Sequence, residues 1–142
     1  MERDAKRFSH LTSEIEAAYH EAALKFGLSD SSLRILYTLC LQGDGCMLHE
    51  VVRLTGISKQ TINSALRKLE KQGILYLKSA EGNKKRVYLT EHGKAFADRS
   101  AMLVLNIEND ILSSWTQAEQ DAYIQLTEKF LSVFKEKVKK EL

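Results

Sequence analysis

The chain contains no proline among its 142 residues, and this absence constrains its fold more than any other feature. Average usage would place roughly seven prolines in a chain of this length. Because proline interrupts helices and is common in turns, its absence, together with only 7 glycines, favours long helices over a turn-rich β-sandwich. The length suits one domain that buries an apolar core without disulfides or a structural metal ion. A hydrophobic content of 44% excludes a disordered chain.

The N-terminal residues and the cysteines indicate a compartment. The residues from Met1 to Asp4 contain no apolar core of a signal peptide. No segment approaches the roughly 18 apolar residues of a membrane-spanning helix. Two cysteines, Cys40 and Cys46, are too few for a disulfide framework. We therefore expect a cytoplasmic protein with reduced thiols.

The formal net charge of +2 conceals two regions of opposite sign. Residues 51–86 hold nine cationic and two anionic side chains, so this segment carries +7 and the rest of the chain −5. A basic middle between acidic arms is typical of proteins that bind nucleic acid. A solvated basic surface would give the same count, so charge alone leaves the two interpretations open.

Apolar side chains recur at helical spacing at the start of the chain. A first helix is expected over residues 5–26, ending at Gly27. Its apolar stripe consists of Phe8, Leu11, Ile15, Ala18, Tyr19, Ala22 and Phe26. Ser29 or Asp30 is expected to cap a second helix, which ends before residues 43–45. The N-terminal part is therefore predicted to be two amphipathic helices.

Two further helices are predicted around a glycine turn. The first is expected over about residues 46–55 and ends at Gly56. The second begins at the capping residue Ser58 and runs to about Gln72. Two helices joined by a tight glycine-containing turn are typical of a helix-turn-helix, whose second helix reads DNA.

The second of these helices has two chemically different faces. At about 100° per residue, one side collects its apolar residues, Ile62, Ala65, Leu66 and Leu69. The opposite side collects Gln60, Ser64, Arg67 and Lys71, flanked by Thr61, Asn63 and Lys68. Glutamine or asparagine can pair with adenine and arginine with guanine, while hydroxyls at a helix N-terminus suit phosphate. An ordinary amphipathic surface helix is the alternative.

Two short β-type runs follow, at residues 74–78 and 86–89. The polar turn between them, residues 81–85, includes Lys84 and Lys85, so the pair is predicted to be a β-hairpin with a cationic tip. A helix-turn-helix followed by such a hairpin is a winged helix-turn-helix. The candidate DNA-binding residues are Ser58, Lys59, Gln60, Thr61, Asn63, Ser64, Arg67, Lys71, Lys84, Lys85 and Arg86.

Long helices are expected to complete the chain. Thr90 is expected to cap a helix that runs through about residue 113. The run from Thr116 to Glu119 matches a capping box for the last helix. The apolar stripe of that helix consists of Tyr123, Leu126, Phe130, Phe134 and Val138. The predicted fold class is mainly α with a small β-hairpin wing, in which long N- and C-terminal helices flank the winged helix-turn-helix.

Three runs of the sequence carry a family resemblance. Residues 54–63 read LTGISKQTIN, residues 66–75 read LRKLEKQGIL and residues 86–93 read RVYLTEHG. Together they resemble the MarR family of bacterial transcription regulators, over about residues 46–93. The helix-turn-helix run is common to many winged-helix families. The hairpin that leads into Leu-Thr-Glu-His-Gly, with long helices at both ends, is what indicates this family.

The resemblance implies a sequence-specific regulator of double-stranded DNA, acting as a homodimeric repressor at a pseudo-palindromic operator. One MarR-like domain would span residues 1–142, with a winged lobe at about 30–93 and a dimerisation region at about 5–26 and 94–142. Further apolar residues support a dimer independently, namely Val104, Leu105, Ile107, Ile111, Leu112 and Trp115. The alternative is that the terminal stripes pack against each other within one monomer.

The wing departs from the family pattern at one position. That pattern often places an acidic residue, any residue and then arginine shortly before the threonine that precedes the next helix. Here those positions hold Glu81, Gly82 and Asn83, so the role of the arginine does not transfer. Lys84, Lys85 or Arg86 would supply the positive charge instead, since a narrow minor groove attracts cationic side chains. Affinity is then expected to come mainly from phosphate contacts.

The sequence predicts no cofactor and no metal site. Cys46 and His49 would share a helical face, but a metal site needs further ligands. Cys40 is expected to be buried on an apolar stripe, and Cys46 to lie near a helix N-terminus, where a thiolate is favoured. Peroxide sensing is not expected, because the first helix lacks the cysteine of oxidant-sensing relatives.

Family members often respond to small molecules. A phenolic or lipophilic effector is the expected type, and Tyr19, His20, Arg34 and Tyr37 are the candidate effector-binding residues. An enzyme is not expected, since there is no glycine-rich phosphate loop, nucleophile elbow or paired catalytic motif. The remaining alternative is a winged-helix module that binds protein or RNA without operator specificity.

Overall fold

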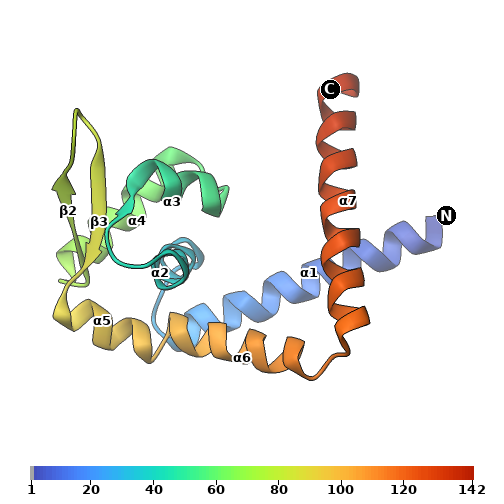
Figure 1. Ribbon diagram of the computed structural model, residues 1–142, viewed down its shortest axis with the longest axis horizontal. Helices are drawn as coiled ribbons and strands as arrows, with labels where there is room; N and C mark the ends of the chain where they lie inside the picture. The colour runs from blue at the N-terminus through green and yellow to red at the C-terminus, as the bar shows by residue number, and fades with distance from the viewer. Residues whose placement is uncertain (1) are drawn as a thin grey trace. The chain divides into compact units, whose positions relative to one another are not determined.

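The computed structural model describes residues 2–142, with side chains from Asp4 onward. Its backbone groups into two units, residues 1–105 and 106–142, each considered by itself below. The helices are α1 (Glu2–Lys25), α2 (Asp30–Gln42), α3 (Leu48–Thr55), α4 (Lys59–Lys71), α5 (Glu91–Asp98), α6 (Ala101–Ser113) and α7 (Gln117–Glu141). The strands are β1 (Cys46–Met47), β2 (Leu75–Ser79) and β3 (Lys85–Leu89) (Figure 1). The predicted fold class is confirmed: mainly helical, with a small β wing.

The ends of the first two helices are set by local hydrogen bonds. After α1, Gly27 adopts a left-handed backbone with φ of +71°, and the Leu28 N–H donates to the Ala23 carbonyl at 2.9 Å. Ser29, rather than Asp30, caps α2, because its Oγ accepts from the Ser32 N–H at 3.1 Å. The predicted breaks at both positions are therefore confirmed.

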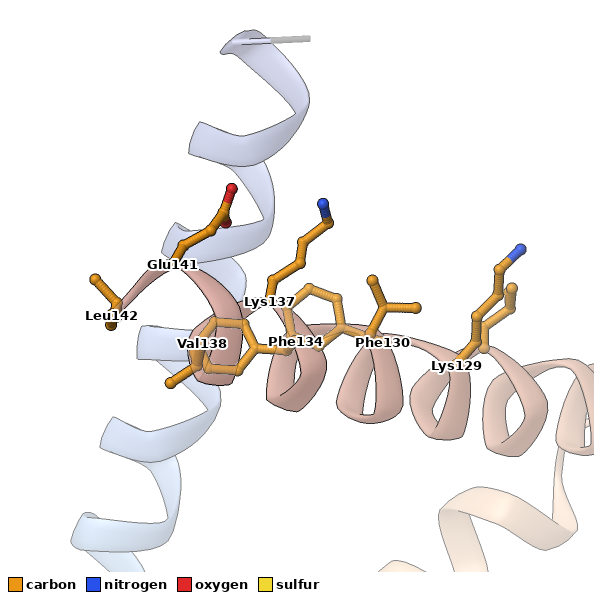
Figure 2. Close-up of a pocket in the computed structure, with 9 residues that line it drawn as sticks. Lys129, Phe130, Phe134, Lys137, Val138, Glu141 and Leu142 are labelled. Atoms are coloured by element: carbon orange, nitrogen blue, oxygen red, sulfur yellow. The ribbon is translucent and has the colours of Figure 1, made fainter.

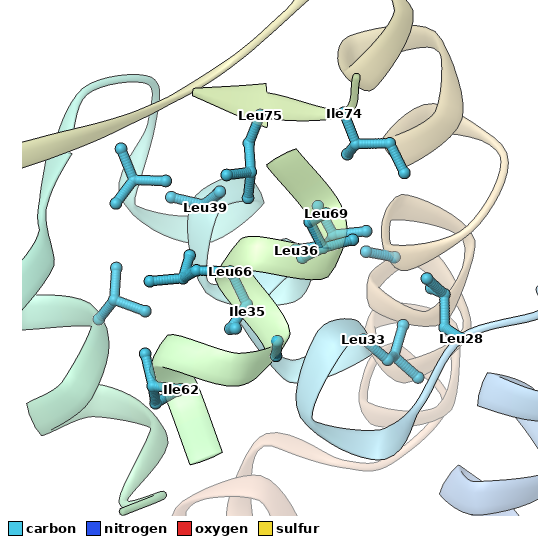
Figure 3. Packing of buried hydrophobic residues seen from close by; sticks show 14 of the residues in the cluster. Leu28, Leu33, Ile35, Leu36, Leu39, Ile62, Leu66, Leu69, Ile74 and Leu75 are labelled. Atoms are coloured by element: carbon cyan, nitrogen blue, oxygen red, sulfur yellow. The ribbon is translucent and has the colours of Figure 1, made fainter. Parts of the chain in front are cut away.

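The winged lobe, by which we mean residues 28–98, surrounds one apolar core (Figure 3). Its largest buried side chains come from every layer of the lobe: Ile35 and Leu36 from α2, Val51 from α3, Ile62 and Leu69 from α4, Leu75 from β2 and Val87 from β3. Burying one such side chain contributes about 1.5–3 kcal/mol. The core therefore fixes α4 by its apolar side and leaves the other side in solvent.

The sheet has three strands rather than the two of the predicted hairpin. The strand order is β1-β3-β2, and Cys46 pairs with Val87 on the far side from β2. The predicted helix over 46–55 is therefore wrong at its start, and α3 begins only at Leu48. The physical reason is that β3 holds this segment: the Gly45 N–H donates to the Val87 carbonyl, and Asp44 Oδ1 accepts from the Leu89 N–H.

The single helix predicted from Thr90 to about residue 113 is also wrong. The structure breaks it at Arg99 and Ser100, between α5 and α6. The buried Ser100 donates its Oγ to the Phe96 carbonyl at 2.7 Å, while its N–H shifts to the Ala97 carbonyl at 3.2 Å. A serine hydroxyl that bonds back to the preceding turn competes with the helical bond and bends the backbone.

Within residues 106–142, α7 begins with the predicted capping box. Thr116 Oγ1 accepts from the Glu119 N–H at 3.1 Å, and Glu119 Oε1 accepts from the Thr116 N–H at 2.9 Å. Gln120 Nε2 also donates to the Leu112 carbonyl at 2.7 Å, which closes the end of α6. No residue of α7 is buried, so this helix contributes no core of its own.

Candidate nucleic-acid interface

The turn before α4 is held by a short set of hydrogen bonds. Gly56 ends α3 with a left-handed φ of +67°. The hydroxyl of the buried Thr55 bridges the turn: it donates to the Val52 carbonyl and accepts from the Ile57 N–H. Arg34 of α2 donates to the Thr55 carbonyl at 3.4 Å. These contacts set the angle at which α4 leaves α3.

The N-terminus of α4 is capped by Ser58, as predicted. Its Oγ accepts from the Thr61 N–H at 3.3 Å and donates to Thr61 Oγ1 at 2.9 Å. Ser58, Lys59, Gln60 and Thr61 are all exposed, so this helix end faces solvent. Unsatisfied N–H groups and the positive end of the helix dipole make such an end suited to phosphate oxygens.

The two faces of α4 are arranged as the sequence predicts. Ile62, Ala65, Leu66 and Leu69 are all buried, with Ile62 and Leu69 fully so. The opposite side carries exposed Gln60, Ser64, Arg67 and Lys71, with Asn63 half-buried at its margin. Every apolar side chain of α4 is thus inside the core, and its solvent face carries amides, hydroxyls and cations.

The wing presents its cations in two different ways. Lys84 and Lys85 are exposed next to the turn, which is closed by a hydrogen bond from the Ala80 N–H to the Lys84 carbonyl at 2.8 Å. Arg86 is exposed but anchored, because its Nη1 donates to the Gly45 carbonyl at 2.8 Å. Asn83 lies exposed in the turn itself. The sequence does not indicate the anchor, because Gly45 is distant along the chain and the adjoining strand β1 falls in a segment predicted to be helical.

Thr90, which follows β3, is hydrogen-bonded to the backbone just after the C-terminus of α4. Thr90 caps α5 by accepting from the Gly93 N–H at 2.8 Å, and its hydroxyl donates to the Gly73 carbonyl at 2.6 Å. Its own N–H donates to the Ile74 carbonyl at 3.0 Å. A Cβ on Gly93 would collide with that same carbonyl. The run Leu-Thr-Glu-His-Gly is therefore explained by a close helix-to-hairpin contact.

The four candidate effector residues lie on two neighbouring helices. Tyr19 and His20 are exposed on α1, while α2 carries the exposed Arg34 and the half-buried Tyr37. His20 Nδ1 lies 2.8 Å from Asp30 Oδ1 and links the two helices, and Arg34 is engaged with α3 as described above. Their role in effector binding stays a prediction.

An apolar groove lies elsewhere, along the C-terminal half of α7 (Figure 2). Phe130, Phe134 and Val138 line it, with Lys129, Lys137 and Glu141 at its edges. Four of the lining residues, these three and Leu126, belong to the stripe that the sequence assigns to the dimerisation region.

Both cysteines are half-buried free thiols with raised pKa values. Burial is the main cause at each site, and the carboxylates of Asp98 for Cys40 and Glu50 for Cys46 raise the pKa further; Arg86 lowers that of Cys46. Cys46 lies near the N-terminus of α3, as predicted, but it belongs to β1. The predictions that it shares a helical face with His49 and that its thiolate is favoured are therefore wrong. Among the side chains that the structure describes, from Asp4 onward, no group of three or more His, Cys, Asp or Glu residues could hold a metal ion.

None of the helices in the described part of the chain is both long and apolar enough to span a membrane. Helix α3 contains an ion pair between the exposed Arg53 and the half-buried Glu50. Arg53 of α3 is held by Glu50 at 2.6 Å, and this pairing lowers the pKa of Glu50 and raises that of Arg53.

Comparison with known proteins gives one family. A model of the MarR family matches residues 26–86. A MarR family regulator from Neisseria meningitidis superposes with a TM-score of 0.83, at 16% identity over 98% of this chain and 99% of that one. MepR of S. aureus in complex with DNA gives 0.71 at 18% identity, covering 92% and 96%. PcaV of Streptomyces coelicolor, with its natural ligand, gives 0.66 at 17%, covering 87% and 91%.

None of the curated proteins matches the chain. The structural likenesses establish the winged-helix fold, and the family model covers the helix-turn-helix together with most of the wing. Residues 26–86 thus match the MarR family of transcription regulators, and the chain has the winged-helix fold of solved MarR family regulators.

Proposed function

We propose that the protein is a homodimeric repressor that binds a pseudo-palindromic operator and is released by a small-molecule effector. The observation that carries this proposal is the solvent face of α4, where amides, hydroxyls and cations stand without any exposed apolar side chain. A surface that binds another protein is usually rich in aromatic and other apolar side chains at its centre. A face of this kind instead matches the donors and acceptors of base edges and phosphates.

The side chains divide by chemistry into two roles. Gln60, Asn63 and Arg67 are assigned to base edges in the major groove, because amides and guanidinium groups form paired hydrogen bonds there. The remaining candidates are assigned to the sugar–phosphate backbone, namely Ser58, Lys59, Thr61, Ser64, Lys71, Lys84, Lys85 and Arg86. Such contacts position the protein without reading sequence.

The terminal helices support the dimer. On α1, Leu11 is 41% and Ile15 is 52% exposed, and on α7 Leu126 is 64% and Phe134 is 56% exposed. Large apolar side chains exposed along two whole helices are typical of a surface that associates. A two-fold dimer would present two α4 helices to half-sites about one turn of DNA apart.

The proposed effector residues lie on α1 and α2. PcaV, whose structure resembles this chain, was crystallised with its natural ligand. We assign a phenolic or lipophilic ligand to the region of Tyr19, His20, Arg34 and Tyr37, where α1 meets the winged lobe. A ligand there would release DNA only by binding better to a dimer whose lobes have another spacing.

The experiment is the selection of bound duplexes from a random pool by the full chain. The expected result is a pseudo-palindromic sequence, bound by two chains, whose isolated half-site binds at least about 100-fold more weakly. Enrichment of an asymmetric site bound by one chain would refute the dimeric reading. Failure to enrich any duplex would refute operator binding and favour the protein- or RNA-binding module.

A further inference from the structure

The outer face of the wing sheet is formed by alternate residues of β2 and β3. Val87 is buried and pairs with Leu77, so these positions face the core. Side chains alternate along a strand, so the neighbouring pairs Tyr76 with Tyr88 and Lys78 with Arg86 share the opposite face. The Tyr76 and Tyr88 rings stack at 5.3 Å between centroids, which confirms that paired residues meet on this side.

Lys78 and Arg86 therefore stand directly opposite each other on that face. Both are exposed, and neither strand contains an acidic residue to compensate them. Like charges directly opposite each other on a sheet destabilise the pairing. A cationic pair at this position weakens the wing unless an anion binds there.

The side chain of Arg86 is also held in place by a hydrogen bond, whereas most surface arginine side chains are mobile. Its Nη1 donates to the Gly45 carbonyl at 2.8 Å, and Gly45 is itself bound to β3 through its N–H and the Val87 carbonyl. Gly45 lies against the Tyr88 ring, where an added Cβ would come within 3.0 Å of the ring carbon Cε1. A guanidinium group has five N–H donors, so the one used on Gly45 leaves the others for a ligand.

We propose that the outer face of the wing is a phosphate-binding surface in which Lys78 and the anchored Arg86 hold one stretch of DNA backbone beside the operator. The proposal rests on the proposed function and adds Lys78, which the sequence did not single out, together with Gly45 as the residue that positions Arg86. A pre-positioned guanidinium loses less freedom on binding phosphate than a mobile one, and the lysine adds a second point charge.

The experiment compares Lys78→Gln with wild type on the selected operator and on a scrambled duplex, across a series of salt concentrations. Lys135→Gln on α7 is the matched control, since it removes the same charge from an exposed position outside the lobe. Lys78→Gln is expected to weaken binding to both duplexes about three- to tenfold. The slope of log affinity against log salt should become less steep by about one. Lys78→Arg should restore the slope.

Thermal unfolding without DNA provides the second readout. Removal of one of two facing cations is expected to leave the melting temperature unchanged or raise it by about 1–3 °C. A salt slope equal to that of wild type and of Lys135→Gln would overturn the proposal, as would loss of affinity for the operator alone. If wild-type protein bound neither duplex, the proposed function itself would fail, which separates the two results.

Discussion

The winged lobe and helix α7 both carry apolar side chains at helical spacing, yet they bury them very differently. In the lobe, four large apolar side chains are fully buried within the single chain, namely Ile35, Leu36, Ile62 and Leu69. In α7 no residue is buried, and Leu126 remains 64% exposed. The lobe therefore has a complete core inside one chain, whereas the apolar stripe of α7 does not.

The lobe is stabilised by a core within one chain, whereas α7 lacks such a core. A core of interlocking side chains fixes the backbone that carries α4 and the wing, so the lobe keeps its reading surface by itself. Helix α7 is favoured locally by its capping box, but isolated helices are marginal in water without tertiary packing. We infer that the lobe supplies recognition and that the terminal helices obtain their packing from a second copy.

Phe134→Asp on α7 is expected to have the largest effect, because it tests whether the exposed stripe of α7 packs against a second copy. Placing a charge at the centre of the stripe in both copies should weaken association by at least about 4 kcal/mol, or roughly 1000-fold, because the burial of two aromatic rings is lost. Sedimentation equilibrium measures the change, and Ser132→Asp, on the opposite side of α7, should leave association intact. A Phe134→Asp protein that associates like wild type would show that this stripe is not the dimer surface.

Gly93→Ala tests the lobe instead. Alanine ordinarily favours a helix over glycine, but here its Cβ would collide with the Ile74 carbonyl and push α5 off the hairpin. We expect a loss of about 3 kcal/mol in the free energy of unfolding, measured by urea denaturation. His92→Ala, at the exposed neighbouring position, should change it by less than about 0.5 kcal/mol. Equal stability of Gly93→Ala and wild type would contradict the close contact.

The cysteines provide a smaller effect that reports on the lobe alone, since both lie in it. Burial raises the pKa of Cys40 and Cys46, so the thiolate fraction at neutral pH is lower than for a free thiol and grows only at higher pH. Alkylation by iodoacetamide at pH 7 should be about tenfold slower than in urea-unfolded protein. Fast alkylation of the native protein would show an open lobe. The monomeric Phe134→Asp variant should react as slowly as wild type.

Local chemistry explains which parts of the fold were predictable. The faces of α4, the Ser58 cap and the capping box at Thr116 depend on residues within a few positions of each other, and the sequence predicts all three. Strand β1 depends on two hydrogen bonds with β3, more than 40 residues away: the Gly45 N–H donates to the Val87 carbonyl, and Asp44 accepts from the Leu89 N–H. No local pattern reports such a pairing, so Cys46 was assigned to a helix.

The break between α5 and α6 was missed for a different reason. A serine inside an apolar helical pattern is usually tolerated, and only the burial of Ser100 makes its bond to the Phe96 carbonyl decisive. In the candidate interface, the residues of α4 follow from periodicity alone. The anchoring of Arg86 and its juxtaposition with Lys78 depend on strand register, which two short β-type runs do not fix.

The most direct test of the account is the affinity of Arg67→Ala for the selected operator and for its single-base variants. Arg67 stands on the solvent face of α4, and its loss should cost about 1–3 kcal/mol and relax specificity at one base pair per half-site. Lys135→Ala controls for the lost charge. If Arg67→Ala binds the operator as tightly and as selectively as wild type, α4 does not read the DNA in the way proposed.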